Sequence, residues 1–224
     1  MLKAALFDMD GVLIDSEPIH KAMYLSVAGE LGCVNAHKDL DAFIGRSSLS
    51  LWEHTLMTHG LEGDPAFYSG LQMRRYREHL SANKGRIHPA PGVPELLKDL
   101  AQNGAALAVA SSNTRENVDF LLDYFGMTHI FGASVSGDDG AACKPAPDIF
   151  LLAAKRLGVP PSGCVVIEDA ASGLAAAKAA GMRCAAIDNP NSGAQDLSLA
   201  DLRVPGAYAL SYAVLNDLAS GRLP

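Results

Sequence analysis

The 224-residue sequence predicts an α/β protein with a doubly wound parallel sheet and a small all-helical domain inserted after the first strand. Two patterns carry this prediction. From residue 91 onward, short apolar runs alternate with segments of helical apolar spacing, which is typical of the crossover units that build a parallel sheet with helices on both faces. Between the first apolar run and residue 91, only helical patterns occur.

The expected strands of the sheet are buried apolar runs that end in polar residues. They are Ala4–Phe7, Ala105–Ala110, Ile130–Val135, Val165–Ile167 and Arg183–Ile187, with Tyr208–Leu210 as a short edge strand. The helices expected between and after them are Val93–Gln102, Arg115–Tyr124, Asp148–Leu157, Ala171–Ala180 and Tyr212–Ala219.

The inserted segment begins at Ser16, which is the expected N-cap of a helix with Pro18 in its first turn and an end near Gly32. Prolines and glycines in residues 83–94 then predict a return linker. We therefore expect a core domain of residues 1–15 and 86–224 and a helical cap domain of residues 16–85. The further helices expected in the cap are Lys38–Ile44, Ser48–Thr58 and Asp64–Leu80.

Composition excludes several classes of protein. A formal net charge of -7 argues against a nucleic-acid or anionic-membrane binder. The four cysteines lie far apart without a Cys-x-x-Cys pair, which disfavours a zinc site or a disulfide framework. Because no segment has the pattern of a secretory signal or approaches membrane length, we expect a cytoplasmic protein. We also expect it to be a monomer or a weak dimer.

Two carboxylates, Asp8 and Asp10, directly follow the first strand, and Gly11 then allows a sharp turn. Open α/β sheets bind ligands at such strand ends. Two neighbouring anions in a cleft require a cation, a shared proton or strong donors, which suggests a Mg²⁺ site. The alternative is an Asp-Gly turn that merely closes an ordinary strand.

Three other segments carry polar residues to the same edge of the sheet. The hydroxyls and free amides of Ser111, Ser112 and Asn113 suit a phosphate group, or else cap the next helix. Lys144 lies between a loop and a helix start and suits a fixed positive charge for phosphate, or else is a surface lysine. Glu168–Asp169 ends a buried strand, where unpaired carboxylates are too costly to be merely structural.

Together these segments resemble the motifs of the haloacid dehalogenase superfamily of phosphoryl-transfer enzymes, over nearly the whole chain. Phe7-Asp8-Met9-Asp10-Gly11-Val12 matches the nucleophile motif, Ser111 the second, Lys144 the third and Glu168-Asp169 the fourth. The helical insert resembles the small cap of that superfamily, on a Rossmann-like core. Residues 15–17 and 144–150 are most similar to phosphatases and β-phosphoglucomutases.

The resemblance implies a role for each of these carboxylates. Asp8 would attack phosphorus and form an aspartyl phosphate, while Asp10 would protonate the departing oxygen and later deprotonate water or a hydroxyl. Mg²⁺ would be held by Asp8, the Asp10 carbonyl oxygen and Asp169, with Glu168 assisting directly or through water. The second aspartate, Asp10, is absent from the dehalogenases of the superfamily and so favours phosphate chemistry.

Other residues would contact the substrate. Ser111 and Lys144 would hold the phosphoryl oxygens. In the cap, Arg46 is expected to meet a sugar hydroxyl, a carboxylate or a second phosphate, with a solvated arginine as the alternative. His20 lies at the position of a cap-hinge histidine in the mutases, although a half-exposed helix histidine is equally compatible with the pattern.

We therefore predict a magnesium-dependent phosphatase of a small phosphorylated metabolite, either a sugar phosphate or a phospho-acid. A β-phosphoglucomutase-like sugar phosphomutase is the first alternative, but Ser48 stands where the mutases carry an arginine three residues after the loop glycine. A catalytically silent binder of phosphorylated metabolites is disfavoured because every expected carboxylate is present. Carbon–phosphorus hydrolysis would need a reactive cap lysine, and nothing marks Lys21 or Lys38 as desolvated.

Overall fold

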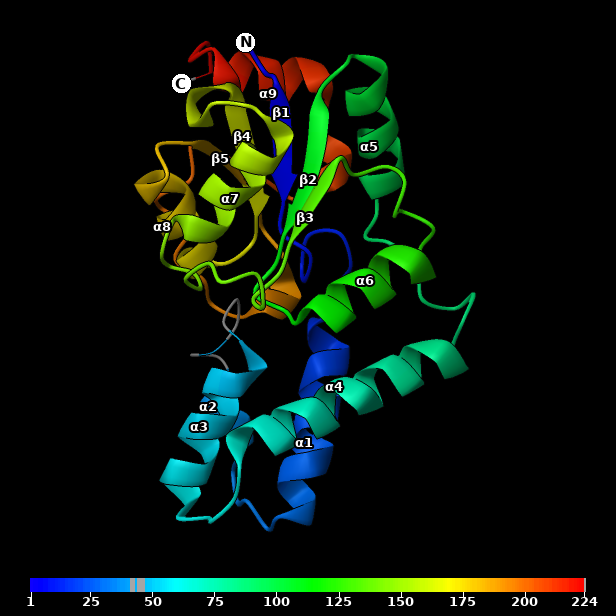
Figure 1. Cartoon of the computed structure of the whole chain (residues 1–224), viewed down its shortest axis with the longest axis vertical. Coiled ribbons are helices and arrows are strands. Elements are labelled where there is room, and N and C mark those ends of the chain that lie inside the picture. The colour runs from blue at the N-terminus through cyan, green and yellow to red at the C-terminus, as the bar shows by residue number, and fades with distance from the viewer. Residues whose placement is uncertain (41–42, 44–46, 224) are drawn as a thin grey trace.

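The computed structural model describes residues 1–40, 43 and 47–223, which form a sheet-containing part and a helical part (Figure 1). Both chain termini lie at the end of the molecule away from the helical part (Figure 1). The predicted substrate contact Arg46 lies outside the described residues, as does the end of the helix expected over Lys38–Ile44.

The described residues contain one parallel sheet in the order β3-β2-β1-β4-β5-β6. Its first strand is central, because β1 pairs with β2 on one side and β4 on the other, and the chain winds outward in both directions. The doubly wound fold class is therefore confirmed. The strands are β1 Ala4–Phe7, β2 Ala106–Ala110, β3 Ala133–Val135, β4 Cys164–Glu168, β5 Arg183–Ile187 and β6 Leu202–Val204.

Helices cover both faces of this sheet. Alternate residues of β1 enter two different cores: Ala5 and Phe7 join one, and Ala4 and Leu6 join the other. The strand is wholly apolar for this reason. Helices α5 and α9 pack on the first side and α7 and α8 on the second. The core helices are α5 Val93–Gln102, α6 Arg115–Tyr124, α7 Asp148–Leu157, α8 Ala171–Ala179 and α9 Tyr212–Ala219, with 3₁₀ turns η1 Pro161–Gly163, η2 Pro190–Ser192 and η3 Ala207–Ala209.

The predicted edge strand at Tyr208–Leu210 is wrong. Residues 207–209 form the 3₁₀ turn η3, and the edge strand is β6, which lies earlier in the chain. The backbone of Tyr208 packs closely against Gly92, where a Cβ would lie 2.3 Å from the Tyr208 nitrogen. The third strand is shorter than predicted and begins at Ala133, since the Ile130 N–H is used in a turn with the Met127 carbonyl.

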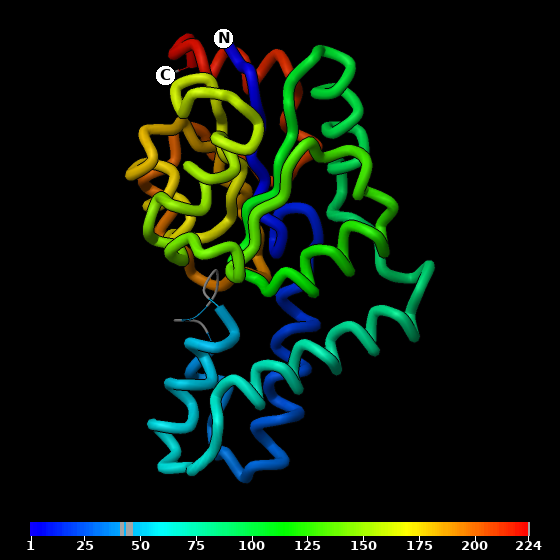
Figure 2. The backbone as a smooth tube through the Cα atoms, viewed as in Figure 1, coloured from blue at the N-terminus to red at the C-terminus, as the bar shows by residue number. Residues whose placement is uncertain are grey.

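The helical part has a small core of its own, formed around Tyr24 and Trp52. Figure 2 shows the chain leaving the sheet once, into the first of these helices, and returning once after the last. The 16–85 boundaries of the cap domain remain a prediction that this path favours. The cap helices are α1 Glu17–Glu30, α2 His37–Leu40, α3 Ser48–His59 and α4 Pro65–Ala82.

Ser16 precedes α1 as predicted, but its side chain makes no capping hydrogen bond. Its hydroxyl instead donates to the Asp10 carboxylate at 2.5 Å. Pro18, in the first turn of the helix, has no N–H that would need a capping acceptor. The Ser16 hydroxyl can therefore bond to the Asp10 carboxylate at the end of the strand. Ser16 therefore connects the beginning of the helical cap to the core through its side chain.

Candidate active site

The first strand brings its two aspartates to the centre of the carboxyl edge of the sheet. Asp8 continues the strand pairing, since its N–H donates to the Ile167 carbonyl at 3.0 Å. Gly11 then turns with a φ of +78°, and a Cβ at this position would lie 1.8 Å from an Asp169 carboxylate oxygen. Only glycine permits this close approach of the turn to the carboxylate.

Lys144 joins carboxylates from two neighbouring strands. Its Nζ donates to Asp8 Oδ1 at 2.5 Å and to Glu168 Oε1 at 2.6 Å, and all three side chains are buried. Burial alone would lower the pKa of Lys144, but the two carboxylates outweigh it and raise that pKa, so the ammonium stays charged. The surface-lysine alternative is therefore excluded by the structure.

Asp8, Glu168 and Asp169 form a buried group whose ligand oxygens lie within 4.8 Å of one another. Burial raises the pKa of Asp8 to about 8 against the lowering effect of Lys144, with Glu168 and Asp10 adding to the rise. Burial, followed by repulsion from Glu168 and Asp8, also raises the pKa of Asp169. Three carboxylates around one ammonium leave excess negative charge, and hard oxygen ligands of this kind fit Mg²⁺.

Asp10 faces a different set of partners. Its carboxylate accepts hydrogen bonds from Ser16 and from the Asn113 amide, and it lies 3.1 Å from His20 Nε2. Burial would raise the pKa of Asp10, but His20 and Ser16 lower it. Burial in turn would lower the pKa of His20, but Asp10 raises it, so the pair favours imidazolium beside carboxylate. The His20 ring stacks on Tyr76 with centroids 4.1 Å apart.

The segment after β2 leaves its polar groups facing the cavity. Thr114 caps α6 by accepting a hydrogen bond from the Asn117 N–H. Residues 111–113 are therefore not the cap of this helix. Ser111 is buried, and its hydroxyl accepts from the Asn113 N–H at 3.1 Å. Ser112 Oγ is buried and has no hydrogen-bond partner among the described residues.

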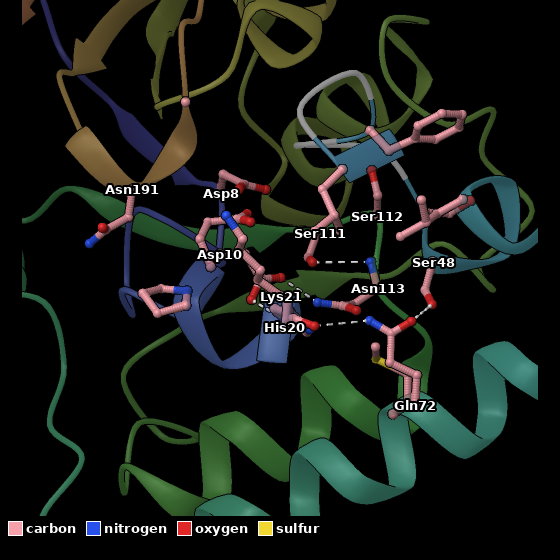
Figure 3. A pocket seen from close by; sticks show the side chains of 18 of the residues that line it. Asp8, Asp10, His20, Lys21, Ser48, Gln72, Ser111, Ser112, Asn113 and Asn191 are labelled. Carbon is pink, nitrogen blue, oxygen red and sulfur yellow. Dashed lines mark hydrogen bonds and ion pairs between the residues drawn. The ribbon is translucent and has the colours of Figure 1, made fainter. Parts of the chain in front are cut away.

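A cavity of about 360 Å³ separates these core residues from the cap helices (Figure 3). Lys144, Glu168 and Asp169 lie beside Asp8, so the structure brings together every predicted site residue that it describes. The predicted residues that line the cavity are Asp8, Asp10, His20, Ser111, Ser112 and Asn113.

Several residues of the site were missed by sequence reasoning. Ser192 donates a hydrogen bond to Asp169, and its short turn η2 gives no periodic signal. Glu17 lines the cavity, and burial raises its pKa to about 7. Gln72 and Tyr76 occupy ordinary positions of a helix. They give no local sequence signal, because their contacts depend on how α4 is placed against the core.

Known proteins match this chain over most of its length. Residues 2–181 match the family model of the haloacid dehalogenase-like hydrolases. The chain is 31% identical to protein CbbY of Rhodobacter capsulatus, over 97% of this chain and 99% of that protein. It is 33% identical to the fructose-1-phosphate phosphatase YqaB of Escherichia coli, over 79% and 92% of the two chains.

A solved structure shares the complete fold. The crystal structure of a CbbY mutant from Rhodobacter sphaeroides in complex with xylulose-(1,5)bisphosphate aligns with a TM-score of 0.81 at 26% identity, covering 94% of this chain and 96% of the other. In the described part of the chain, no helix is both long enough and apolar enough to cross a membrane.

Proposed function

This chain belongs to the haloacid dehalogenase-like hydrolase family, and from that premise we propose that it is a magnesium-dependent phosphatase in which Asp8 is the nucleophile. The observation that carries this proposal is the buried cluster around Asp8. Lys144 holds one oxygen of Asp8, and the carboxylates of Glu168 and Asp169 lie next to it. Such a cluster has no structural purpose that an apolar core would not serve better.

In the proposed reaction, the second carboxylate oxygen of Asp8 forms a bond to phosphorus as the bond to the leaving oxygen breaks. The leaving oxygen takes the electron pair and receives, through Asp10, the proton that His20 and Asp10 share. His20 and Asp10 together hold one proton at this position, because each shifts the pKa of the other toward the paired, charged form. Water then attacks phosphorus and Asp10 takes its proton, while the bond between phosphorus and the Asp8 oxygen breaks, which releases phosphate and restores the Asp8 carboxylate.

Mg²⁺ would be held by Asp8, Asp169 and the main-chain carbonyl of Asp10, with Glu168 direct or through water. When bound, it would neutralise charge on the transferring phosphoryl group. Lys144, the Ser111 hydroxyl and the main-chain amide of Ser112 would hold the phosphoryl oxygens. Lys144 is suited to this role because its position is fixed by two short ion pairs.

We favour hydrolysis over the mutase alternative because of the cap side of the cavity. A mutase must hold a second phosphate, which requires a cationic group. Ser48 supplies a neutral hydroxyl at the relevant position, and it is already engaged with Gln72 at 2.9 Å. Among the described residues that line the cavity, the one lysine or arginine is Lys21, which is exposed on α1.

The test is an assay of phosphate release from a panel of sugar phosphates and phospho-acids with Mg²⁺, comparing the parent with Asp8→Asn. The amide is a very poor nucleophile, so we expect a loss of at least a thousandfold with the fold intact by circular dichroism. Asp8→Asn activity within tenfold of the parent would remove Asp8 from the mechanism. With β-glucose 1-phosphate and a bisphosphate primer, glucose 6-phosphate formation that outpaces phosphate release would favour the mutase.

A further inference from the structure

The cap side of the cavity contains a buried glutamine whose amide has a fixed orientation. Gln72 lies on α4 and is 2% exposed. Its Oε1 accepts from the Trp52 indole N–H at 2.7 Å and from the Ser48 hydroxyl at 2.9 Å. An indole N–H can only donate, so the atom that it contacts must be the amide oxygen. The orientation of this side chain therefore follows from its neighbours.

The amide nitrogen consequently faces the other way. Figure 3 shows it directed from α4 toward His20, whose carbonyl oxygen is 3.5 Å from Nε2. This single hydrogen bond is at the long limit and uses one of the two N–H groups. Within the described residues the second N–H has no hydrogen-bond partner, and Gln72 lines the cavity, so a ligand there can accept from it. Gln72 thus presents a neutral donor opposite the aspartates of the core.

The charges around the cavity disfavour a second anion in the same place. Among the described residues, three carboxylates line it, from Asp8, Asp10 and Glu17. Of the basic side chains described there, His20 is paired with Asp10 and Lys21 is exposed to solvent. Arg77 lies in an adjoining cavity and not in this one; its Nη2 pairs with Glu116 at 2.9 Å, and its Nη1 has no hydrogen-bond partner among the described residues. A neutral amide cannot compensate a buried carboxylate or phosphate, but it pairs well with a hydroxyl oxygen.

We propose that Gln72 determines specificity by favouring phosphate monoesters whose leaving group is a neutral sugar or polyol over those that carry a second phosphate or a carboxylate. This inference rests on the proposed phosphatase function. The free N–H of Gln72 donates to a hydroxyl oxygen of the leaving group. Trp52 is a positioning residue, because its indole sets which end of the amide faces the substrate.

The first test measures kcat/KM for sugar and polyol monophosphates, each paired with its bisphosphate, and for p-nitrophenyl phosphate, whose leaving group has no hydroxyl donor or acceptor for Gln72. We expect the parent to prefer the best monophosphate over its bisphosphate at least tenfold. Gln72→Lys should reduce this preference at least tenfold, because an ammonium attracts the second phosphate. Its activity on p-nitrophenyl phosphate should stay within about threefold of the parent.

The second test separates orientation from packing by means of two aromatic variants of the cap core. Trp52→Phe removes the indole donor and lets the amide reverse, so KM for the best monophosphate should rise about threefold or more while kcat on p-nitrophenyl phosphate is retained. Tyr24→Phe is the matched control, because it removes a buried hydroxyl whose hydrogen bond is to Thr55, at 2.8 Å, and not to Gln72. It should leave the KM for the best monophosphate and the kcat on p-nitrophenyl phosphate unchanged, and thermal unfolding checks that each variant is folded.

The outcomes distinguish this inference from the function on which it rests. If no substrate, including p-nitrophenyl phosphate, releases phosphate, the proposed function fails and the inference fails with it. If the parent hydrolyses p-nitrophenyl phosphate but shows no preference for monophosphates, or if Gln72→Lys retains the parent's preference, the role of Gln72 alone is overturned. A KM change in Tyr24→Phe equal to that in Trp52→Phe would reduce Trp52 to a packing role.

Discussion

Individual residues hold the buried carboxylates where a metal and a phosphate would need them. The Glu168 carboxylate accepts hydrogen bonds from the main-chain N–H groups of Asp169 and Ala170, at 2.8 Å each, and from Lys144 Nζ at 2.6 Å. Gly173, one turn into α8, leaves the space that this carboxylate fills, since a Cβ there would lie 1.7 Å from Glu168 Oε1. A glycine with no reactive group of its own is therefore part of the site.

Gly173→Ala is expected to displace Glu168 and break its ion pair with Lys144. Because the displaced carboxylate would remain buried without its partner, we expect phosphate release to fall at least a hundredfold and the melting temperature to fall by several degrees. Gly29→Ala is the matched control. This glycine is also inside a helix, but a Cβ there meets nothing within 4 Å, so the change should stabilise by about 0.5–1 kcal/mol. Full activity of Gly173→Ala would show that Glu168 is dispensable.

Some residues of the site could be predicted from the sequence and others could not. Asp8, Asp10 and the acidic pair were predictable because carboxylates at the ends of buried strands are costly unless they bind one another or a ligand. Lys144 was predictable as a fixed positive charge for phosphate between a loop and a helix start. Gln72 could not be predicted, since a glutamine on an amphipathic helix is ordinary. Its importance depends on a donor-only indole 20 positions away in the chain, and no local pattern encodes that contact.

Mg²⁺ binding should be measurable without any turnover. The excess negative charge of the Asp8 cluster would be relieved by the cation, so Mg²⁺ at 100 times its dissociation constant should stabilise the fold by about 2.7 kcal/mol. For a chain of this size that corresponds to a rise in melting temperature of roughly 5–10 °C. Asp169→Asn should lose most of this rise in differential scanning fluorimetry. An equal rise in Asp169→Asn would place the cation elsewhere. Ca²⁺ should give the rise but inhibit the enzyme.

At the scale of elements, the loop after β3 is bonded to two helices, α6 and α7, through the carboxylate of Asp139. Asp139 accepts from the Ser136 N–H at 2.8 Å, from Arg156 on α7 at 3.1 Å and from Arg115 on α6. Burial would raise the pKa of Asp139, but the amide and the two guanidinium groups outweigh it and lower the pKa. This carboxylate therefore connects the segments that lead to Asn113 and to Lys144.

Asp139→Asn should reduce the free energy of unfolding by about 1–2 kcal/mol at pH 7, because the charge-assisted hydrogen bonds are lost. The folded state has the lower pKa, so the contribution is full above the unfolded value of about 4 and disappears as the pH falls toward the folded value. The difference between parent and variant in urea unfolding should thus shrink between pH 5 and pH 3. A constant difference would mean that the ionised form of Asp139 is not the source of the stability.

Elements with clear start and stop residues were predicted closely, and those without were not. Helix α7 ends at Leu157 before Gly158, which adopts a φ of +68°, and its bounds match the prediction. Strand β6 has three residues, too few for a period of two to be visible, and the apolar run at Tyr208 competed with it. The shortest elements are placed by tertiary contacts such as the one between Tyr208 and Gly92.

At the scale of the whole molecule, the start of the cap is bonded directly to the catalytic edge of the core. Ser16 and His20 both contact Asp10, so a rotation of the cap about residues 15–16 changes the partners of this carboxylate. Two further contacts tie the distal half of α4 to α6: the ion pair of Arg77 with Glu116, and the Tyr124 hydroxyl, which donates to the Leu80 carbonyl at 3.0 Å. A movement of the cap would therefore change the contacts of Asp10, the proposed site of proton transfer.

We therefore predict that the cap moves about two linkers, near Ser16 and at residues 85–91, when ligand binds. Closure would exclude water from the cavity and bring Gln72 toward the leaving group. Hydrogen exchange in the presence of Mg²⁺ and a phosphate mimic such as aluminium fluoride should slow in both linkers and at the first turn of α1, while the buried strands β1 and β4 serve as the internal reference. The closing motion must rearrange the Ser16 and His20 contacts with Asp10, so Ser16→Ala should alter exchange at the first linker more than at the second. Unchanged exchange in both linkers and throughout the cap would favour a rigid, open cavity, in which Asp10 keeps its present partners during the reaction.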